Sequence, residues 1–331
     1  MPRHLPATAT RGDRRRGGRD RCRLQLSVQR RARRDPRSAG GDGVSRRYAL
    51  SRLERRRQEL RLVPSPSASL PGSTPPDVAT YSRFKHGDGA TARLYGESLA
   101  ALALARVRRL GLLPVVVTGS GFDVVPPAAH SLVAPFTETL RAKLGPDTPV
   151  TAAKIVRTRP SESDYAAMDA TARRTAISGA LDVSALADTV RGAHVIALDD
   201  VIVTGLHEHA ADQALRDAGA AAVDHLYVVD AHCQRHTPWV ESELNQVAVR
   251  TVEDVLALAA RTDFVPNSRV ARLVFALSQA ELVAVAATAP ESFLIWLTDV
   301  AATDPLAAPP RYADGVLVLR ELRSALLSLP R

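Results

Sequence analysis

The stretch VIALDDVIVTGLHEHAADQALRDAGA, residues 195–220, decides the fold class. It begins with an apolar run that is typical of a buried strand, and two adjacent aspartates, Asp199 and Asp200, end that run. A helix is expected at residues 206–218, with Gly219 as its stop. Neighbouring carboxylates repel each other, and each needs water or a partner, so a strand gains no stability from ending in two of them. We therefore expect the two aspartates to bind a ligand.

Apolar runs and helical segments alternate on both sides of this stretch. Such an alternation favours an α/β fold with a doubly wound, mainly parallel sheet that helices cover on both faces. After residue 233 the pattern changes to amphipathic helices, with one further strand expected at GVLVLRE, residues 315–321. The four strands of the sheet are expected at residues 112–119, 149–157, 193–200 and 223–231.

The chain divides by composition into three expected parts. Residues 1–62 hold 20 Arg, no Lys and 6 Asp or Glu, which is a net charge of +14; in a chain whose total is +9, the remaining residues carry −5. Few large apolar residues and a high charge predict a disordered leader, and a Pro/Ser-rich linker follows it. We expect leader and linker at 1–78, an α/β domain at 79–232, and a mostly helical C-terminal extension at 233–331.

The Arg-rich leader has three explanations. An arginine arm binds nucleic acid through phosphate contacts. A solvated tail, or a start codon assigned too far upstream, explains the composition more simply, and we favour these two over nucleic-acid binding. The basic start is not followed by the apolar core of a secretory signal, and no run of about 18 apolar residues occurs. We therefore expect a cytoplasmic protein without a membrane partner.

The turn after the aspartates suits a phosphate group. In an open parallel sheet, ligands bind beyond the carboxyl ends of the strands, often at a helix N-terminus. Thr204 and Gly205 lie at such a turn, where backbone N–H groups are exposed. Carboxylates one step earlier suit the hydroxyl groups of a sugar, or an Mg2+ ion bound to that sugar. Together the two features fit a ribose 5-phosphate that lies along the end of the strand.

VIALDDVIVTG, residues 195–205, resembles the phosphoribosyl pyrophosphate (PRPP) motif of type I phosphoribosyltransferases. In that motif four apolar residues, two acids, two or three apolar residues and Thr-Gly follow one another. The resemblance implies that Asp199 and Asp200 bind the ribose hydroxyl groups. It also implies a cradle for the 5-phosphate, formed by Val203, Thr204, Gly205, Leu206 and His207. A Rossmann-like domain, in which the acids only hydrate the end of a strand, is the alternative that we favour less.

The turn after the first expected strand lies where this family has its pyrophosphate-binding loop. VTGSGFDVVP, residues 117–126, contains two glycines, which let backbone N–H groups approach a ligand closely. The loop residues implied by the resemblance are Thr118, Gly119, Ser120 and Gly121. An ordinary turn between a strand and a helix explains the segment equally well.

A long polar stretch, residues 158–178, lies where the family has a mobile catalytic loop that closes over the pyrophosphate. Arg157 and Arg159 would then meet the leaving pyrophosphate, with Lys154 just before them on the strand. A solvated loop surface explains these cations equally well. The candidate catalytic residues are thus these three cations together with the two aspartates.

DDVIVTGLHE, with YSRFKHGDG upstream and apolar C-terminal helices, is most similar to bacterial phosphoribosyltransferase-like proteins encoded in tellurium-resistance and stress-response gene clusters. Arg83 and Lys85 in YSRFKHGDG would contact an anionic ligand, or else form the basic start of a helix. His207 stands where many members have a second hydroxyl residue, and it either donates to the phosphate or caps the helix at the surface. Val203 stands where some purine-specific members carry a carboxylate base, so that role is vacant here.

The resemblance implies a glycosyltransferase of nucleotide metabolism or stress-linked biosynthesis, which transfers the phosphoribosyl group between PRPP and a nitrogenous base. Mg2+ is the expected cofactor, carried by PRPP without direct metal ligands from the protein. A protein that senses PRPP or a nucleotide without turnover is the second hypothesis, and a nucleic-acid factor that works through the leader is the third. The acceptor base or nucleotide stays open, and so does the oligomeric state, including a homodimer.

Overall fold

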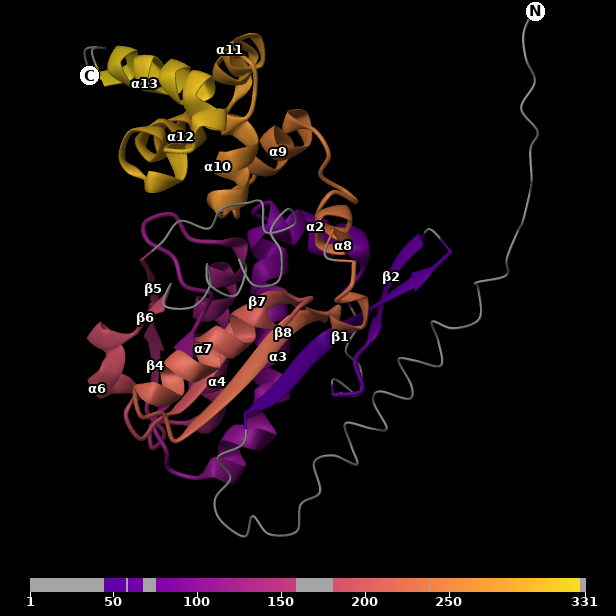
Figure 1. Ribbon diagram of the computed structural model, residues 1–331, viewed down its shortest axis with the longest axis vertical. Helices are drawn as coiled ribbons and strands as arrows, with labels where there is room; N and C mark the ends of the chain where they lie inside the picture. Colours follow the sequence, from indigo (N-terminus) through magenta and orange to yellow (C-terminus); the bar gives the residue numbers. More distant parts are fainter. Residues whose placement is uncertain (1–44, 58, 68–75, 159–180, 238, 328–331) are drawn as a thin grey trace, which may run out of the picture. The chain divides into compact units, whose positions relative to one another are not determined.

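The computed structural model describes residues 45–57, 59–67, 76–158, 181–237 and 239–327 (Figure 1). The expected leader up to residue 44, Arg159 and most of the expected catalytic loop lie outside the described residues. None of the helices in the described ranges combines the length and the apolar character that are needed to cross a membrane.

The strands of the central sheet are β1 (Arg46–Arg56), β2 (Glu59–Pro64), β3 (Val115–Thr118), β4 (Val150–Ala153), β7 (His194–Ile202) and β8 (Ala222–Asp230). They are ordered β2-β1-β8-β7-β3-β4, and every neighbouring pair is parallel except β1–β2 at one edge. Parallel strands need crossover connections, which helices supply here, so the doubly wound, mainly parallel sheet is confirmed. A separate antiparallel pair consists of β5 (Val156–Arg157) and β6 (Leu181–Asp182).

The described helices of the α/β part are α2 (Val78–Lys85), α3 (Gly89–Leu110), α4 (Val133–Leu144), α6 (Ala187–Val190) and α7 (Leu206–Asp217). Those of the C-terminal part are α8 (Val240–Asn245), α9 (Val252–Ala259), α10 (Ser268–Phe275), α11 (Gln279–Thr288), α12 (Glu291–Thr303) and α13 (Ala313–Leu327). Short 3-10 turns are η1 (Ala128–Leu132), η2 (Ser184–Leu186), η3 (His232–Gln234), η4 (Pro305–Ala307) and η5 (Pro310–Tyr312). Side-chain caps set several helix starts: Asp88 accepts from the backbone N–H of Thr91 at α3, and Asn267 caps α10 in the same way.

Alternate residues of the buried strands face opposite sides of the sheet. In β7, Ile196 belongs to a core cluster with Leu99 of α3 and Phe136 of α4. The preceding Val195 belongs to a different cluster, with Leu215 of α7. Helices therefore cover both faces, which is why β3 and the first half of β7 are apolar runs in the sequence.

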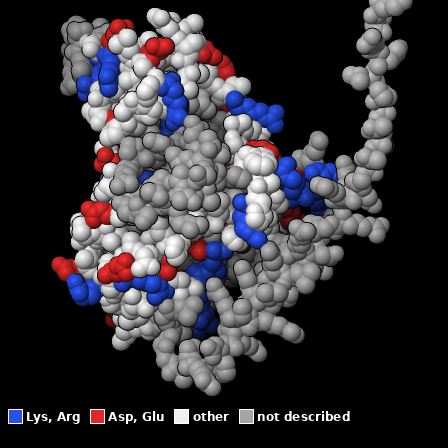
Figure 2. Space-filling model, in the orientation of Figure 1, with Lys and Arg blue, Asp and Glu red and all other residues white. Residues whose placement is uncertain are grey.

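The N-terminal limit of the folded part corrects the sequence prediction. Our limit at residue 78 is wrong, because residues 46–64 form β1 and β2 of the central sheet. The many arginines obscure a strand pattern, in which Ser51 and Leu53 are buried while Arg56 is exposed. Figure 2 shows basic side chains gathered near this pair of strands. The prediction of disorder from the high charge fails for these residues, because β1 is stabilised by pairing with β2 and with β8.

The helical character of the chain after residue 233 is confirmed, with one correction. GVLVLRE, expected as a strand, lies within α13. Val316 and Leu319 are buried there whereas Leu317 is 58% exposed, which is the spacing of a helix and not the alternation of a strand. The buried side chains belong to a second hydrophobic core, which α9 to α13 mainly form.

Candidate functional site

The aspartate pair lies near the carboxyl end of β7, which runs between β8 and β3. Successive side chains of a strand point to opposite faces, so the two carboxylates meet different partners. Asp199 accepts a hydrogen bond of 2.8 Å from the Ser120 hydroxyl, which belongs to the loop after β3. Asp200 faces α2, where the Lys85 ammonium group lies 2.5 Å from its carboxylate. The pair thus joins two segments that the sequence associates with ligand binding.

Burial raises the pKa of Asp199 to about 7, and the neighbouring Asp200 charge acts in the same direction. The hydrogen bond from Ser120, a second from the backbone N–H of Asp200 (2.9 Å) and the charge of Lys85 oppose this increase. Near neutral pH, Asp199 therefore exists in both protonation states, and its carboxyl group can donate as well as accept a hydrogen bond. Such a group suits a sugar hydroxyl, which also donates and accepts.

Lys85 is the centre of a charge network at this edge of the sheet, in which Lys85 and Asp200 are buried and Glu241 is partly exposed. Its side chain is 6% exposed and that of Asp200 is 9% exposed. A second acid, Glu241 of α8, lies 3.4 Å from the same ammonium group, and Arg269 of α10 lies 3.7 Å from Glu241. Removing one partner of a buried ion pair leaves an uncompensated charge, which costs about 3–5 kcal/mol. The network thus fixes α2, α8 and α10 against the end of β7.

Glu241 and Arg269 are residues of this network that sequence reasoning missed. Burial raises the pKa of Glu241, but Lys85 and Arg269 outweigh burial and hold that pKa below its ordinary value. No motif marks the acid, which lies 156 positions from Lys85. Tyr81 lies one turn before Lys85 on α2, and its buried hydroxyl has no hydrogen-bond partner in the described part of the chain. Burial and the nearby Asp200 charge raise the pKa of that hydroxyl well above its ordinary value.

The turn between β7 and α7 contains a left-handed glycine directly before the helix. Gly205 adopts a φ of 79°, in the left-handed region where a side chain would be strained. It is the N-cap of α7, so the first N–H groups of that helix lie at the turn. His232 fixes the turn by donating from Nδ1 to the Val203 carbonyl (3.1 Å), and the Thr204 hydroxyl accepts from the backbone N–H of Leu206 (3.5 Å). The segment predicted to hold the 5-phosphate therefore lies at a helix N-terminus, close in sequence to the aspartate pair.

Arg47 of β1 lies beside the same turn, although its sequence position lies within the expected leader. A β-carbon on Gly205 would lie 3.9 Å from the Arg47 guanidinium group. Arg47 donates two hydrogen bonds of 2.6 Å to Glu208, and the Tyr227 hydroxyl donates a third of 3.1 Å. Burial raises the pKa of Glu208, but Arg47 and Tyr227 hold it below its ordinary value. The arginine thus offsets the negative charge that Glu208 brings to the turn.

His207 occupies the first turn of α7. The surrounding protein removes water from its ring and lowers its pKa, and the charge of Arg157 acts in the same direction. A neutral imidazole still donates one hydrogen bond, so His207 can donate to a phosphate without adding charge. The Arg157 charge thus acts on the first turn of α7, where His207 lies.

Some residues of the loop after β3 lie at the candidate site, and others lie in the protein interior. Ser120 donates to Asp199, whereas Thr118 is buried and its hydroxyl donates to the Gly119 carbonyl (3.3 Å). A β-carbon on Gly121 would lie 2.8 Å from a neighbouring leucine side chain, so glycine allows the close approach at this position. Of the side chains predicted for the pyrophosphate loop, Ser120 is the one that the structure brings to the acid pair.

Two of the three cations predicted for the pyrophosphate contact the loop after β3. Lys154 donates to the Asp123 carbonyl, and its ammonium group lies 4.3 Å from the centre of the Phe122 ring. The backbone N–H of Arg157 donates to the Phe122 carbonyl (3.3 Å), which attaches β5 to that loop. Arg159 lies outside the described residues. Lys154 and Arg157 therefore meet the same loop residue.

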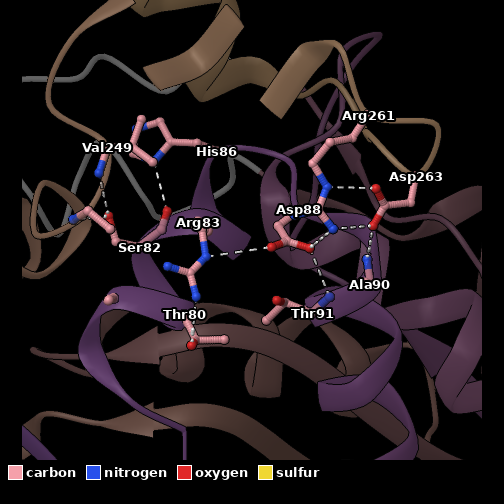
Figure 3. Close-up of polar contacts among 12 residues, drawn as sticks. Thr80, Ser82, Arg83, His86, Asp88, Ala90, Thr91, Val249, Arg261 and Asp263 are labelled. Carbon is pink, nitrogen blue, oxygen red and sulfur yellow. Dashed lines mark hydrogen bonds and ion pairs between the residues drawn. The ribbon is translucent and has the colours of Figure 1, made fainter. Parts of the chain in front are cut away.

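The segment YSRFKHGDG contributes to two regions of the protein. Lys85 reaches the acid pair, whereas the Arg83 guanidinium group lies 3.8 Å from Asp88 and donates to the Thr80 hydroxyl at 3.1 Å (Figure 3). Asp88 also lies 3.5 Å from Arg261 of the C-terminal part. Arg83 thus belongs to the junction of α2, α3 and the C-terminal part, and the predicted contact with an anionic ligand does not separate its position from that of Lys85.

The acid pair alone fits Mg2+ incompletely. In the ranges that the structure describes, no three His, Cys, Asp or Glu side chains come together as metal ligands. Mg2+ takes about six oxygen ligands and commonly keeps substrate phosphates among them. Asp199 offers an oxygen here, whereas Asp200 is engaged by Lys85. The residues present therefore fit an Mg2+ ion only together with oxygens from a substrate.

Several solved structures show similarity to the chain. A hypoxanthine phosphoribosyltransferase variant from Trypanosoma cruzi, in a ternary substrates complex, is 16% identical with a TM-score of 0.32, and the match covers 46% of this chain and 74% of that chain. A hypoxanthine phosphoribosyltransferase from Staphylococcus aureus is 11% identical with a TM-score of 0.25, covering 46% and 64%. A phosphoribosyltransferase from Corynebacterium diphtheriae is 14% identical with a TM-score of 0.24, covering 47% and 97%.

The family of the chain follows from its sequence. None of the curated proteins matches it. Residues 72–316 match the family described as PRTase ComF-like, where PRTase stands for phosphoribosyltransferase. The matched range contains the aspartate pair, the glycine turn and most of the C-terminal helices, and it makes up well over half of the 331 residues. The chain belongs to the ComF-like phosphoribosyltransferase family.

Proposed function

We propose that the protein binds PRPP with Mg2+ and transfers the phosphoribosyl group between pyrophosphate and a nitrogenous base. One observation carries the proposal: the aspartate pair and the glycine turn lie at the carboxyl edge of a parallel sheet, with the loop after β3 hydrogen-bonded to the pair. A ligand with sugar hydroxyl groups, a 5-phosphate and a pyrophosphate needs this combination of neighbours. Membership in the family supports the same class of reaction.

Each part of the substrate has a proposed partner. Asp199 receives a ribose hydroxyl group, because it both donates and accepts near neutral pH. Asp200 receives the second hydroxyl group while Lys85 offsets its charge. The backbone N–H groups from Gly205 into α7 hold the 5-phosphate, with His207 as a neutral donor. The loop around Ser120 receives the pyrophosphate.

The proposed reaction is a displacement at the anomeric carbon of the ribose. The bond to pyrophosphate breaks while a bond to a nitrogen of the base forms, through a transition state that resembles an oxocarbenium ion. That nitrogen loses its proton, which passes to the leaving pyrophosphate or to water. Such a reaction needs positioning and stabilisation of charge more than a protein nucleophile. We propose Lys154, Arg157 and Arg159 for the negative charge that develops on the leaving pyrophosphate. Mg2+ bound with PRPP would neutralise the same charge.

A second function is favoured by the Lys85–Asp200 ion pair and by Val203. The valine is buried and apolar at the position where some purine-specific members carry a carboxylate base. A protein with this site could bind PRPP without turnover and act as a sensor of its concentration. Ribose hydroxyl groups would then compete with Lys85 for Asp200, and a shift of Lys85 would reach Glu241 and the C-terminal part.

We also propose a cellular setting in stress-linked nucleotide metabolism, associated with tellurium resistance. The similarity of DDVIVTGLHE and YSRFKHGDG to proteins of such gene clusters supports it. Deleting the gene should then lower the tolerance of the cells to tellurite. Unchanged tolerance would remove this setting and leave the biochemical proposal intact.

Release of pyrophosphate separates the transferase from the sensor. The full-length protein is incubated with Mg-PRPP and a panel of purine and pyrimidine bases, and pyrophosphate is measured with a coupled assay. A transferase releases pyrophosphate only with its acceptor, and the double variant Asp199→Asn/Asp200→Asn loses that release. A sensor binds PRPP and releases none with any base. A protein that neither binds PRPP nor releases pyrophosphate contradicts both functions.

A further inference from the structure

Helix α10 carries two arginines one turn apart, Arg269 and Arg272. Arg269 lies 3.7 Å from Glu241. The half-buried Arg272 side chain, by contrast, makes no hydrogen bond or ion pair within the described ranges. A guanidinium group has five N–H donors and no acceptor, so an unpaired one at a half-buried position needs an anion or water to satisfy it.

The surroundings of Arg272 are positively charged. Burial lowers the pKa of Arg272, and the charges of Arg269, Arg157 and Arg311 lower it further, while Tyr312 acts in the opposite direction. Like charges that gather away from bulk water repel each other strongly. Glu241 compensates Arg269, and Arg311 lies over the Tyr312 ring, whereas Arg272 has no acidic partner in the described ranges, which indicates that Arg272 serves a ligand.

The cluster borders the loop after β3, which belongs to the proposed site. At the start of α10, the backbone N–H of Ser268 donates to the Pro126 carbonyl (2.9 Å). The backbone N–H of Arg157 donates to the Phe122 carbonyl (3.3 Å) of the same loop. Arg157 also lies close enough to His207 to lower its pKa. Positive charge therefore extends from the phosphate turn past this loop to α10.

We propose that Arg272, with Arg269 and Arg157, forms a subsite for a phosphate or pyrophosphate group. Guanidinium groups bind phosphate oxygens through paired N–H···O bonds, and a phosphate would satisfy the donors of Arg272, which have no partner in the described ranges. The subsite rests on the proposed function, because the loop that it borders is the one assigned to the pyrophosphate. Its occupant is the pyrophosphate of PRPP or a phosphate group on the second substrate. In both cases the C-terminal part supplies charged residues to the ligand edge.

Titration of inorganic pyrophosphate and inorganic phosphate into the full-length protein tests the subsite. Arg272→Gln should weaken pyrophosphate binding by about tenfold or more, and Arg272→Lys should weaken it less, because lysine keeps the charge but loses the paired donors. Arg191→Gln removes the same charge from an exposed position before β7 and should leave binding unchanged. Thermal unfolding checks the fold, and the Arg272 variants should unfold at the temperature of the parent or above it. Equal pyrophosphate affinity in parent and Arg272→Gln, or no binding by the parent, would overturn the subsite.

Titrations with PRPP and with ribose 5-phosphate show which phosphate group occupies the subsite. If the pyrophosphate of PRPP occupies the subsite, Arg272→Gln weakens PRPP binding and leaves ribose 5-phosphate binding unchanged. If a phosphate of the second substrate occupies the subsite, Arg272→Gln leaves the affinities for PRPP and for ribose 5-phosphate unchanged. The variant then weakens the binding of inorganic phosphate to protein that is saturated with PRPP. The double variant Asp199→Asn/Asp200→Asn keeps the two proposals apart. Unchanged PRPP binding in that variant rejects the ribose site, whereas pyrophosphate binding that is unchanged in Arg272→Gln, or absent in the parent, rejects the subsite.

Discussion

The Lys85 ammonium group lies 2.5 Å from the Asp200 carboxylate, although 115 positions separate the two residues in the sequence. Helix α2 thereby gives the aspartate pair a fixed positive charge before any ligand binds. Glu241 shares that lysine and connects it to Arg269 on α10. The charge of the proposed ribose site therefore depends on residues of the α/β part and of the C-terminal part together.

Replacing Lys85 with methionine should destabilise the protein. Lys85→Met leaves Asp200 buried without its partner, which costs about 3–5 kcal/mol in the free energy of unfolding. Denaturant titration measures that free energy, and Lys143→Met on the exposed surface of α4 should change it by less than about 0.5 kcal/mol.

The double variant Lys85→Met/Asp200→Asn shows whether the uncompensated charge is the cause. It should be more stable than Lys85→Met, because the buried carboxylate is removed together with its partner. Equal stability of the single and the double variant would show that the ion pair does not hold α2 against β7.

The pKa of Asp199 should make stability depend on pH. Burial and the Asp200 charge raise this pKa from 3.8 to about 7, so between these values the folded protein keeps a proton that the unfolded chain has released. The contribution of Asp199 to the free energy of unfolding is therefore largest at low pH, falls as the pH rises through this range, and becomes constant above about pH 7. Urea titrations of the parent and Asp199→Asn from about pH 5 to about pH 8 measure the difference. If the free energies of unfolding of the two proteins differ by the same amount at every pH, the raised pKa of Asp199 is contradicted.

The left-handed turn at Gly205 should be needed for phosphate binding. Gly205→Ala strains a backbone with a φ of 79°, which costs about 1–2 kcal/mol and shifts the N–H groups at the start of α7. Gly145→Ala is the control at a second glycine with a positive φ, where φ is 78°, ψ is −177° and nothing lies within 4 Å of an added β-carbon. Because glycine alone adopts that combination readily, Gly145→Ala should lose at least as much stability as Gly205→Ala, and only Gly205→Ala should lose affinity for ribose 5-phosphate. Equal affinity for ribose 5-phosphate in the two variants would show that the turn at Gly205 does not bind the phosphate.

Removing the Ser120 hydroxyl should raise the pKa of Asp199 further, because the hydrogen bond from Ser120 lowers it in the parent. Carbon NMR of the Asp199 carboxyl group during a pH titration measures the change in Ser120→Ala. Ser131→Ala removes a hydroxyl that donates to the Ala128 carbonyl and should leave the titration as it is. An identical titration in the parent and Ser120→Ala would mean that the loop does not contact the acid pair in solution.

Local patterns were sufficient to predict the centre of the fold. The strand at residues 193–200 and the helix from 206 are confirmed as β7 and α7, because the apolar run and the glycines that bound them act over short distances. The edge of the sheet could not be predicted in this way. β1 contains many arginines and is stable because it pairs with strands on both sides, which its own composition does not reveal.

The parts of the candidate site that lie close together in the sequence could be predicted. The aspartate pair and the Gly205 turn follow one another in the chain, so their placement at one edge of the sheet follows from β7 and α7. The partners of Asp200 could not be derived, because they depend on how α2 and α8 pack against the sheet. Lys85 and Arg83 are two residues apart and alike in charge, and only the packing of α2 separates their positions.

Calorimetric titration of Mg-PRPP into the full-length protein and into the double variant Asp199→Asn/Asp200→Asn tests the central claim most directly. The ribose-phosphate site predicts micromolar binding by the parent and a loss of at least about tenfold in the variant, with both proteins equally folded by circular dichroism. Absence of binding by the parent, or equal affinity in the two proteins, would contradict the proposal that the aspartate pair binds PRPP.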